Sequence, residues 1–175
     1  PSWPVHILIV PKAAVPSLLD LRRTQEYILQ DAYTAAVAIA KQNGALESGH
    51  MLLVNGGTYQ DVGQLHFHLV APADETLCES DGFSRSPVIA ESLHLSAYPH
   101  PRPRRAMHVV ISPKSQGHEI ADGADVMAEA VQIARLILGC IGSGSTSFTF
   151  VVRVCTQDNA RSTCFHVVAG GDATP

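Results

Sequence analysis

Two histidines one residue apart, His66 and His68, are the residues of this chain best suited to chemistry. They lie in residues 64–70, where polar and apolar residues alternate. Because strand side chains alternate between the two faces of a sheet, we expect Gln64, His66 and His68 to share one face and the apolar residues to face a core. Two imidazoles beside an amide suit either a metal-binding pair or a nucleophile whose neighbour binds the charge of a substrate.

The elements that position this pair are predicted from hydrophobic spacing. Residues 5–10 form an apolar, β-rich run that ends at a proline, which predicts a buried strand. Residues 17–42 have the period of a helix, with Ser17 as its cap and an Asn-Gly pair at its end. Residues 51–54 and 65–71 predict two further strands joined by a glycine-rich turn.

The composition changes after this unit. Residues 72–103 are rich in proline, serine, glutamate and arginine, with weak strand candidates at residues 87–90 and 93–97. The proline run at residues 99–103 predicts a turn or an exposed connection, because proline donates no backbone hydrogen bond to a sheet.

The remainder of the chain matches its first part in the same order. Residues 107–114 match residues 5–12 without gaps at a shift of 102, and residues 163–169 match residues 65–71 at a shift of 98. The elements predicted between them are a helix and a strand, at residues 123–138 and 148–154. This order indicates an internal repeat, with chance similarity between short apolar strands as the alternative.

Together these features resemble the histidine triad (HIT) superfamily. Its signature is His-φ-His-φ-His-φ-φ, where φ is apolar, with an asparagine-containing turn and a His-φ-φ-φ-φ-Pro-Lys strand upstream. The matching segments here are Gln64-Leu65-His66-Phe67-His68-Leu69-Val70, Asn55-Gly56-Gly57 and His6-Ile7-Leu8-Ile9-Val10-Pro11-Lys12. The resemblance covers residues 5–71. Residues 87–169 resemble a second, eroded copy whose triad positions hold Ser162, Cys164 and His166.

The resemblance implies an α+β fold with an antiparallel sheet and a long helix in each of two tandem HIT-like halves. We expect residues 1–76 to form the half that carries the active-site motif, and residues 77–175 to form the degenerate half. Family members commonly form two-fold dimers that join two sheets, so the repeat implies an intrachain pseudo-dimer, with a homodimer as the alternative.

The resemblance also implies a reaction that needs no cofactor. His66 would attack the α-phosphorus of a nucleotide substrate and form a nucleotidyl-histidine that water hydrolyses or an acceptor takes up. The main-chain carbonyl of Gln64 would hold one ring nitrogen of His66, and His68 would contact the phosphate. Asn55 would position polar groups of the nucleotide, and His6 would complete the polar cluster.

Two departures from the family pattern leave alternatives open. Gln64 replaces the first histidine and exchanges no proton near neutral pH, and Asp61 stands where relatives commonly carry a hydroxyl that assists the leaving group. The sequence therefore predicts a nucleotide hydrolase or nucleotidyl transferase, with a weak or inactive nucleotide-binding protein as the alternative. A metal-dependent protein that uses His6, His66 and His68 as ligands is the third hypothesis.

The other candidate residues receive simpler interpretations. Cys164 is expected to be a buried structural cysteine, and His108 and His166 are expected to be hydrogen-bonded remnants of a second site. Four further histidines are expected to be exposed: His50, His94, His100 and His118. An arginine cluster is expected either to form a solvated loop or to fold over the His66 pocket: Arg102, Arg104 and Arg105.

Composition limits the partners. Twelve basic residues against 16 acidic ones, a net charge of −4, provide no general cationic surface, so the sequence predicts neither nucleic acid nor membrane as a partner. The longest apolar runs are too short to span a bilayer, and no signal peptide is evident. Four cysteines without a C-x-x-C pair are expected to be reduced thiols, and the predicted location is cytoplasmic.

Overall fold

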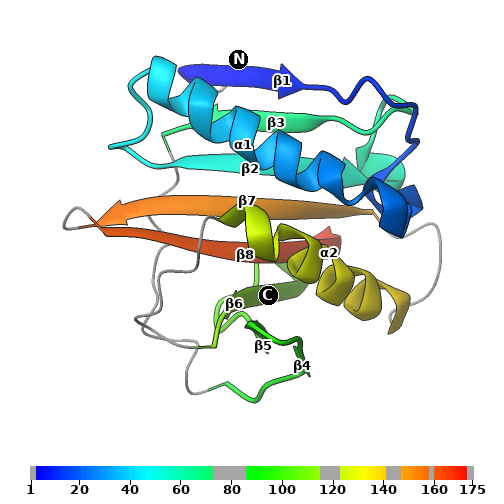
Figure 1. The fold of residues 1–175 in the computed structure, drawn as a ribbon. Helices are drawn as coiled ribbons and strands as arrows, with labels where there is room; N and C mark the ends of the chain where they lie inside the picture. The colour runs from blue at the N-terminus through cyan, green and yellow to red at the C-terminus, as the bar shows by residue number, and fades with distance from the viewer. Residues whose placement is uncertain (1–2, 73–85, 115–122, 141–146, 158–159, 173–175) are drawn as a thin grey trace.

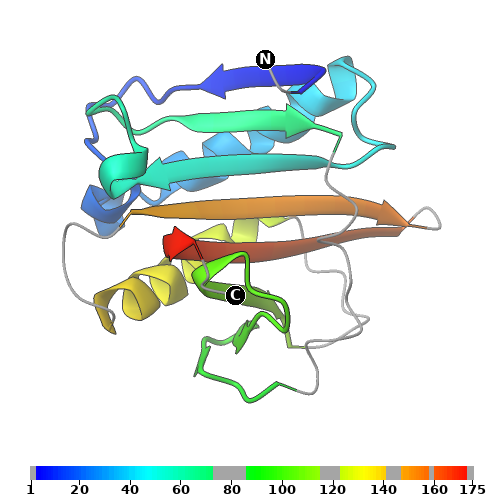
Figure 2. The ribbon, with the colours of Figure 1, turned by 180° about the vertical axis from the view of Figure 1, so that it is seen from behind.

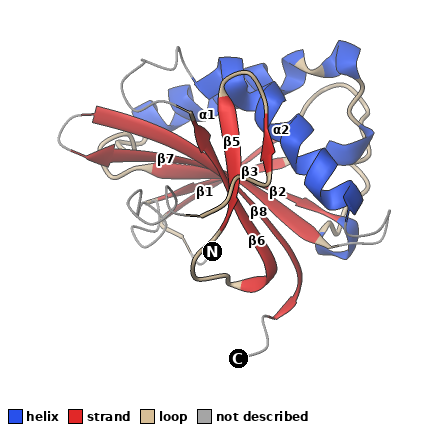
Figure 3. Cartoon of the chain, turned by 90° about the horizontal axis from the view of Figure 1, so that it is seen from below, coloured by secondary structure: helices blue, strands red, loops and turns tan. Residues whose placement is uncertain are grey.

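The fold is an eight-stranded antiparallel sheet with two helices packed on one face, as the computed structural model shows (Figure 1). The structure describes residues 3–72, 86–114, 123–140, 147–157 and 160–172. The strand order is β1-β3-β2-β7-β8-β6-β5-β4. Among these described residues, no helix lies on the other face of the sheet, as the view from behind and the view from below both show (Figures 2 and 3).

The elements follow one another in two similar series. The first comprises β1 (Val5–Ile9), α1 (Tyr27–Gln42), β2 (His50–Gly56) and β3 (Phe67–Ala71). Short 3-10 turns lie at Leu18–Asp20, Arg23–Gln25 and Gly57–Tyr59. The second series comprises β4 (Ala90–Glu91), β5 (Leu95–Pro99), β6 (Arg105–Pro113), α2 (Gly123–Cys140), β7 (Phe148–Gln157) and β8 (Ala160–Asp172).

The two series share one pairing pattern. β3 lies between β1 and β2, and β8 lies between β6 and β7. The series meet where β2 pairs with β7, with Leu53 opposite Val151. Asn55 pairs with Thr149, and Arg153 pairs with Met51. Asn55 and Arg153 each follow the central pair by two residues in their own strand, so they occupy equivalent positions in the two series. The predicted α+β class, with a large antiparallel sheet and two long helices, is confirmed, and the division at residues 76 and 77 stays a prediction.

The first helix begins later than its sequence predicts. α1 starts at Tyr27, ten residues after Ser17, and the intervening chain forms two 3-10 turns. Ser17 donates its hydroxyl hydrogen to Asp20 (2.6 Å) and does not cap a helix through its side chain. Leu18 and Leu21 are still buried, so apolar spacing alone did not distinguish these turns from a helix.

Strand lengths depend on the available partners. β3 begins at Phe67 and not at residue 65, because Phe67 is the last residue that pairs with β1, opposite Ile9. β7 and β8 are longer than predicted because they pair with each other along a continuous ladder, from Phe148 with Ala169 to Gln157 with Ala160.

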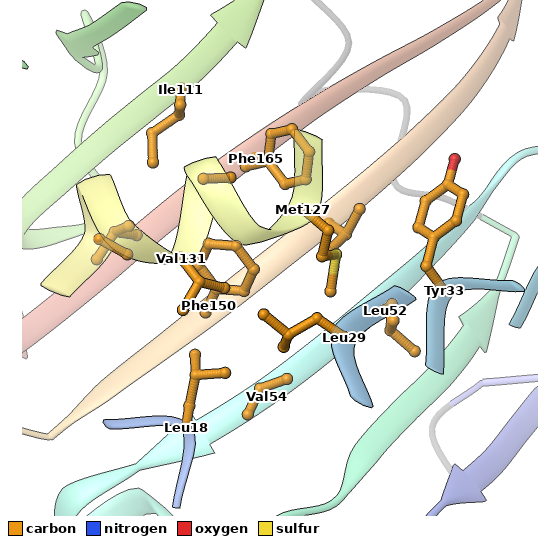
Figure 4. Close-up of a cluster of buried hydrophobic side chains, with 14 of the residues drawn as sticks. Leu18, Leu29, Tyr33, Leu52, Val54, Ile111, Met127, Val131, Phe150 and Phe165 are labelled. Atoms are coloured by element: carbon orange, nitrogen blue, oxygen red, sulfur yellow. The ribbon is translucent and has the colours of Figure 1, made fainter. Parts of the chain in front are cut away.

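A single hydrophobic core fills the space between the sheet and both helices (Figure 4). Leu52, Phe150 and Phe165 project from three strands toward Leu29 of α1 and Met127 of α2. All five side chains are buried, and burying such a side chain contributes about 1.5–3 kcal/mol. The two series of elements therefore share one core.

A hydrogen bond also joins the two series of elements. Arg135 of α2 donates a hydrogen bond from Nη2 to the carbonyl oxygen of Leu18 (2.9 Å) in the first series. In the part of the chain that the structure describes, no helix is long and apolar enough to span a membrane.

The helix-free face carries an ordered row of side chains. Opposed residues of antiparallel strands share a face, and the register places His68, Leu53, Val151 and His166 side by side across four strands. His68 and His166 are three strand spacings apart, which is about 14 Å. The two histidines therefore lie at opposite ends of this row, with the apolar Leu53 and Val151 between them.

Candidate active site

The alternation predicted around the histidine pair is present. Leu65, Phe67 and Leu69 are at most 1% exposed, because they point to the helix-covered side of the sheet. His66 and His68 are partly exposed and project from the helix-free face. The apolar side chains of this segment therefore face the core, and its two histidines face the opposite side of the sheet.

One ring nitrogen of His66 is held by the chain itself. His66 Nδ1 lies 2.8 Å from the main-chain oxygen of Gln64. Because a carbonyl oxygen only accepts, Nδ1 must carry the proton and donate it. In the neutral ring the lone pair is then on Nε2, the nitrogen free to react with an electrophile.

His68 and His6 form a pair beside this ring. His6 Nε2 lies 2.9 Å from His68 Nδ1, and the rings of His66 and His68 meet edge to face at 4.9 Å. Burial, followed by repulsion from His66 and then His6, lowers the pKa of His68 below its ordinary value of 6.5. His68 Nε2 is itself buried, so a partner there would be recognised in a dry environment.

Gln64 divides its roles between backbone and side chain. Its carbonyl oxygen accepts from His66, whereas its side-chain amide donates to the carbonyl oxygens of Ala13 (3.0 Å) and Pro11 (3.4 Å). The amide therefore holds the segment that follows β1. Because its hydrogens point to those carbonyls, the Gln64 side chain does not take the proton-donating place of a histidine.

Asn55 is held from the second series of elements. Thr149 of β7 donates its hydroxyl hydrogen to Asn55 Oδ1 (2.8 Å). Nearby, Tyr59 donates to the carbonyl oxygen of Gly170 (2.9 Å), and Thr58 contacts Ser147 through their hydroxyls. Sequence reasoning missed Thr149, because only the pairing of β2 with β7 brings it to this site.

Asp61 is placed apart from these contacts. It is exposed, in the turn before β3, and among the described residues it forms no hydrogen bond or ion pair with the histidines. The described contacts therefore join His6, His66, His68 and the Gln64 carbonyl, and they join neither Asn55 nor Asp61 to the histidines.

A second histidine pair repeats the geometry of the first. His108 Nε2 lies 3.1 Å from His166 Nδ1, and their ring centroids are 5.3 Å apart at 48°. The corresponding values for His6 and His68 are 5.2 Å and 40°. The prediction that His108 and His166 are held by hydrogen bonds agrees with this contact.

Two histidines expected to be exposed are not. His100 stacks on His108, with centroids 3.9 Å apart and planes at 8°, and His50 is only 2% exposed. β5 pairs with β6 up to Pro99, which brings His100 next to His108 although the proline run resembles a loop. His94 is exposed as expected and pairs with Glu129, whereas His118 lies outside the described residues.

The arginine cluster lies against the second pair. The backbone N–H of Arg104 donates to His108 Nδ1 (3.4 Å), and the Arg104 side chain lines a cavity with His108 and His166. The described contacts thus place Arg104 beside its own series of elements and not over His66.

The cysteines differ from the expectation in one respect. Cys155 is disulfide-bonded, so the prediction that all four cysteines are reduced thiols is wrong. Cys164 is partly buried, and burial raises the pKa of its thiol to about 11, against a smaller lowering by Arg153. Protonated at neutral pH, this thiol fits the structural role predicted for it. The cytoplasmic location stays a prediction, and the disulfide argues the other way.

Comparison with known sequences gives a consistent set of similarities. The family model described as "Scavenger mRNA decapping enzyme C-term binding" matches residues 1–84. A purine nucleoside phosphoramidase of Escherichia coli strain K12 is 36% identical over 72 residues, which is 40% of this chain and 60% of that protein. An uncharacterized HIT-like protein of Buchnera aphidicola is 35% identical over 72 residues, 63% of its length. The chain spans about three fifths of these relatives.

Solved structures share the fold over nearly the whole chain. A uridylyltransferase superposes with a TM-score of 0.65 at 17% identity, covering 97% of this chain and 65% of that one. The yeast Ap4A phosphorylase in complex with Ap4A gives a TM-score of 0.53 at 12% identity, covering 95% and 53%. At these identities the likeness is one of fold.

Proposed function

The chain belongs to the histidine triad superfamily, and from that premise we propose that it cleaves or transfers a nucleotide at the α-phosphorus, with His66 as nucleophile. The observation that carries this proposal is the 2.8 Å contact between His66 Nδ1 and the Gln64 carbonyl oxygen. That contact leaves the lone pair on Nε2, as nucleophilic catalysis by imidazole requires. The named relatives, a phosphoramidase among them, support the same kind of chemistry.

The first step forms a bond between His66 Nε2 and phosphorus, while the bond from phosphorus to the leaving group breaks. The ring then carries the nucleotidyl group on Nε2 and its proton on Nδ1, where the Gln64 carbonyl stabilises the positive charge. In the second step the oxygen of water, or of an acceptor hydroxyl or phosphate, bonds to phosphorus, the bond from phosphorus to Nε2 breaks, and neutral His66 is released; the proton of the attacking water or hydroxyl passes to solvent. Hydrolysis and transfer therefore differ only in the second nucleophile.

The neighbouring residues bind the phosphate and the nucleotide. His68 contacts a phosphoryl oxygen by donating from Nε2, which requires that His68 Nδ1 accept the proton of His6 Nε2. His6 thus positions His68. Asn55, whose Oδ1 is engaged by Thr149, has its amide hydrogens left to orient polar groups of the nucleotide.

The leaving group is the point at which this site differs from the family pattern. The Gln64 amide donates to Ala13 and Pro11, and Asp61 is exposed, so neither supplies a proton to a departing group. We therefore expect leaving groups that depart as stable anions, such as phosphates, to be preferred over amines. The same two residues favour the second candidate, a nucleotide-binding protein without turnover.

The second half serves mainly as a scaffold in this proposal. The pairing of β2 with β7 supports the proposal that residues 1–76 and 77–175 form an intrachain pseudo-dimer, and Thr149 extends that support into the first site. The repeated geometry of the two histidine pairs supports the duplication.

Turnover of an adenosine phosphoramidate and of Ap4A tests the function. We expect AMP release by the wild-type protein, faster with Ap4A, and a loss of about 100-fold or more in His66→Ala. A labelled nucleotidyl-protein should accumulate on rapid quenching of the wild type only. His94→Ala, an exposed histidine of the other half, is the matched control and should keep wild-type turnover. Equal inertness of wild type and His66→Ala, with nucleotide still bound, establishes the binding alternative.

A further inference from the structure

A cavity lies on the helix-free face of the sheet, next to the row of residues between His68 and His166. Its volume is about 210 Å³. Arg104, His108 and His166 contribute polar and basic groups to its lining, and Trp3, Leu53 and Val151 contribute apolar ones. Neither His66 nor His68 contributes to its walls. The cavity therefore combines a polar, basic wall with an apolar one, as small-molecule sites commonly do.

The proton positions of the histidines here follow from their contacts. The backbone N–H of Arg104 donates to His108 Nδ1 (3.4 Å), so the proton of neutral His108 is on Nε2. That proton is donated to His166 Nδ1 (3.1 Å), which places the proton of His166 on Nε2, 3.4 Å from Cys164 Sγ. The donors thus run in one direction, from the Arg104 backbone to the sulfur.

The direction of these hydrogen bonds disfavours a metal ion at this cluster. The ligand atoms of His100, His108 and His166 do lie within 4.8 Å of one another. A neutral histidine that binds a metal through Nε2 carries its proton on Nδ1, donated to a carbonyl or carboxylate. In His100 and His108, however, Nδ1 accepts a backbone N–H, from Arg102 (3.0 Å) and Arg104. A metal would have to reverse both contacts.

The charges around the cluster favour an anion. After burial and the neighbouring histidines, Arg153 and Arg104 lower the pKa of His166 further, and Arg104 also lowers the pKa of His100 and His108. Among the described residues, the charged side chains that lower the pKa of these rings are guanidinium groups, which repel a cation and bind oxyanions through several donors. Arg153 is fully buried and lies opposite Cys164 in the sheet.

We propose that this cavity binds a small oxyanion ligand, a phosphate monoester or a carboxylate. Arg104, exposed at the mouth, contacts the charged group, and an apolar part of the ligand lies against Trp3, Leu53 and Val151. His66 takes no part in this site, although Thr149, which donates to Asn55, also lines the cavity. The proposal assigns a binding role to the half of the chain whose first two triad positions hold Ser162 and Cys164.

Trp3 makes the proposal directly measurable, because it is the single tryptophan of the chain and lines the cavity. Intrinsic fluorescence is titrated with phenyl phosphate, inorganic phosphate and benzoate. We expect a saturable change, tighter for the ligands with a ring, and a loss of affinity of about tenfold or more in Arg104→Ala. Arg102→Ala removes an adjacent exposed arginine but keeps its backbone N–H, and should bind as the wild type does.

His66→Ala separates this site from the first one and should retain the full response. Tighter binding of phenyl phosphate than of benzoate assigns the ligand as a phosphate, and the reverse order as a carboxylate. The proposal is overturned if no probe gives a saturable change, if Arg104→Ala binds as the wild type does, or if His66→Ala abolishes the response. A stoichiometric Zn²⁺ response that persists in Arg104→Ala would overturn it in favour of a metal site.

Discussion

A carbonyl oxygen accepts hydrogen bonds and never donates them, and this asymmetry determines which nitrogen of His66 carries the proton. The same reasoning applied to a backbone N–H gives the opposite outcome for His108, whose Nδ1 accepts from Arg104. The two sites therefore differ beside histidine pairs of nearly equal geometry. In the first site His66, next to the pair, keeps a lone pair on Nε2, whereas in the second site the equivalent position is Cys164, which lies 3.4 Å from His166 Nε2.

At the residue scale, acid should destabilise the fold through His108. Burial, then repulsion from His100 and Arg104, lowers its pKa to about 3, below the value of 6.5 expected when unfolded. The unfolded chain therefore binds the extra proton, so this contribution to stability is complete above about pH 6.5 and is lost as the pH falls toward about 3. Burial likewise lowers the pKa of His166, which adds to the effect.

Urea unfolding at about pH 7 and about pH 4.5 measures this contribution. The free energy of unfolding should fall on acidification, and it should fall less in His108→Asn, which lacks the titrating ring. The comparison concerns the change with pH, so a lower stability of the variant at neutral pH does not affect it. Equal changes in both proteins would contradict the assigned cause.

Residue types and spacing predicted the central features of the candidate site. The alternation of residues 64–70 was enough to separate the buried Phe67 from the histidines, because a strand allows only two directions for its side chains. It was not enough for Gln64 or His100. The Gln64 amide donates to a segment that is distant in the sequence, and His100 stacks on His108 from an irregular, proline-rich segment. Local spacing encodes neither contact.

At the scale of elements, the turn after β2 is fixed by close packing. A Cβ on Gly56 would overlap the ring of Phe148, which is 1% exposed and has no room to swing aside. Gly56→Ala should therefore lower the free energy of unfolding by about 1–3 kcal/mol, as overpacking does. Gly63→Ala is the matched control, because a Cβ there meets open space.

Urea denaturation of both glycine variants checks this expectation. Gly63→Ala should be neutral or slightly stabilising, since alanine restricts the unfolded chain more than glycine does. If Gly56→Ala proves as stable as Gly63→Ala, the contact with Phe148 does not limit this turn.

β7 also supports the first site through Thr149. Thr149→Val keeps the shape of the side chain but removes the hydrogen bond to Asn55, so nucleotide affinity or turnover should fall by about 2- to 10-fold. Stability should change little. Thr163→Val, which loses only the 3.5 Å contact with Tyr33 outside the site, is the control. Titration with AMP and the turnover assay give the measurement, and equal behaviour of the two variants would contradict a positioning role.

At the scale of the whole molecule, the shared core predicts one unfolding transition. Side chains from both series of elements pack in the same cluster, and Arg135 links α2 to the carbonyl oxygen of Leu18. Fluorescence of Trp3, which lies against residues of both series, and far-ultraviolet circular dichroism, which reports on the helices and strands of both, should give coincident urea curves. Two separated transitions would show that the halves fold independently.

The sequence predicted the antiparallel sheet and the two long helices, and the resemblance implied that two sheets join within one chain, but neither identified the strands at which they join. The matches at shifts of 102 and 98 compare each segment with its counterpart, and they contain no information on which strands meet. The pairing of Leu53 with Val151 depends on the shape of both halves together. The fold of each series was therefore more predictable than the interface that supports Asn55.

The covalent connection between the two series has a consequence for mutation. When identical subunits form a dimer, one gene encodes both pockets, so every substitution appears twice and must suit both. Here the equivalent positions on either side of the Leu53 and Val151 pair hold Asn55 and Arg153. Because the two pockets are encoded separately, one can hold a positive charge at this position while the other keeps a neutral amide.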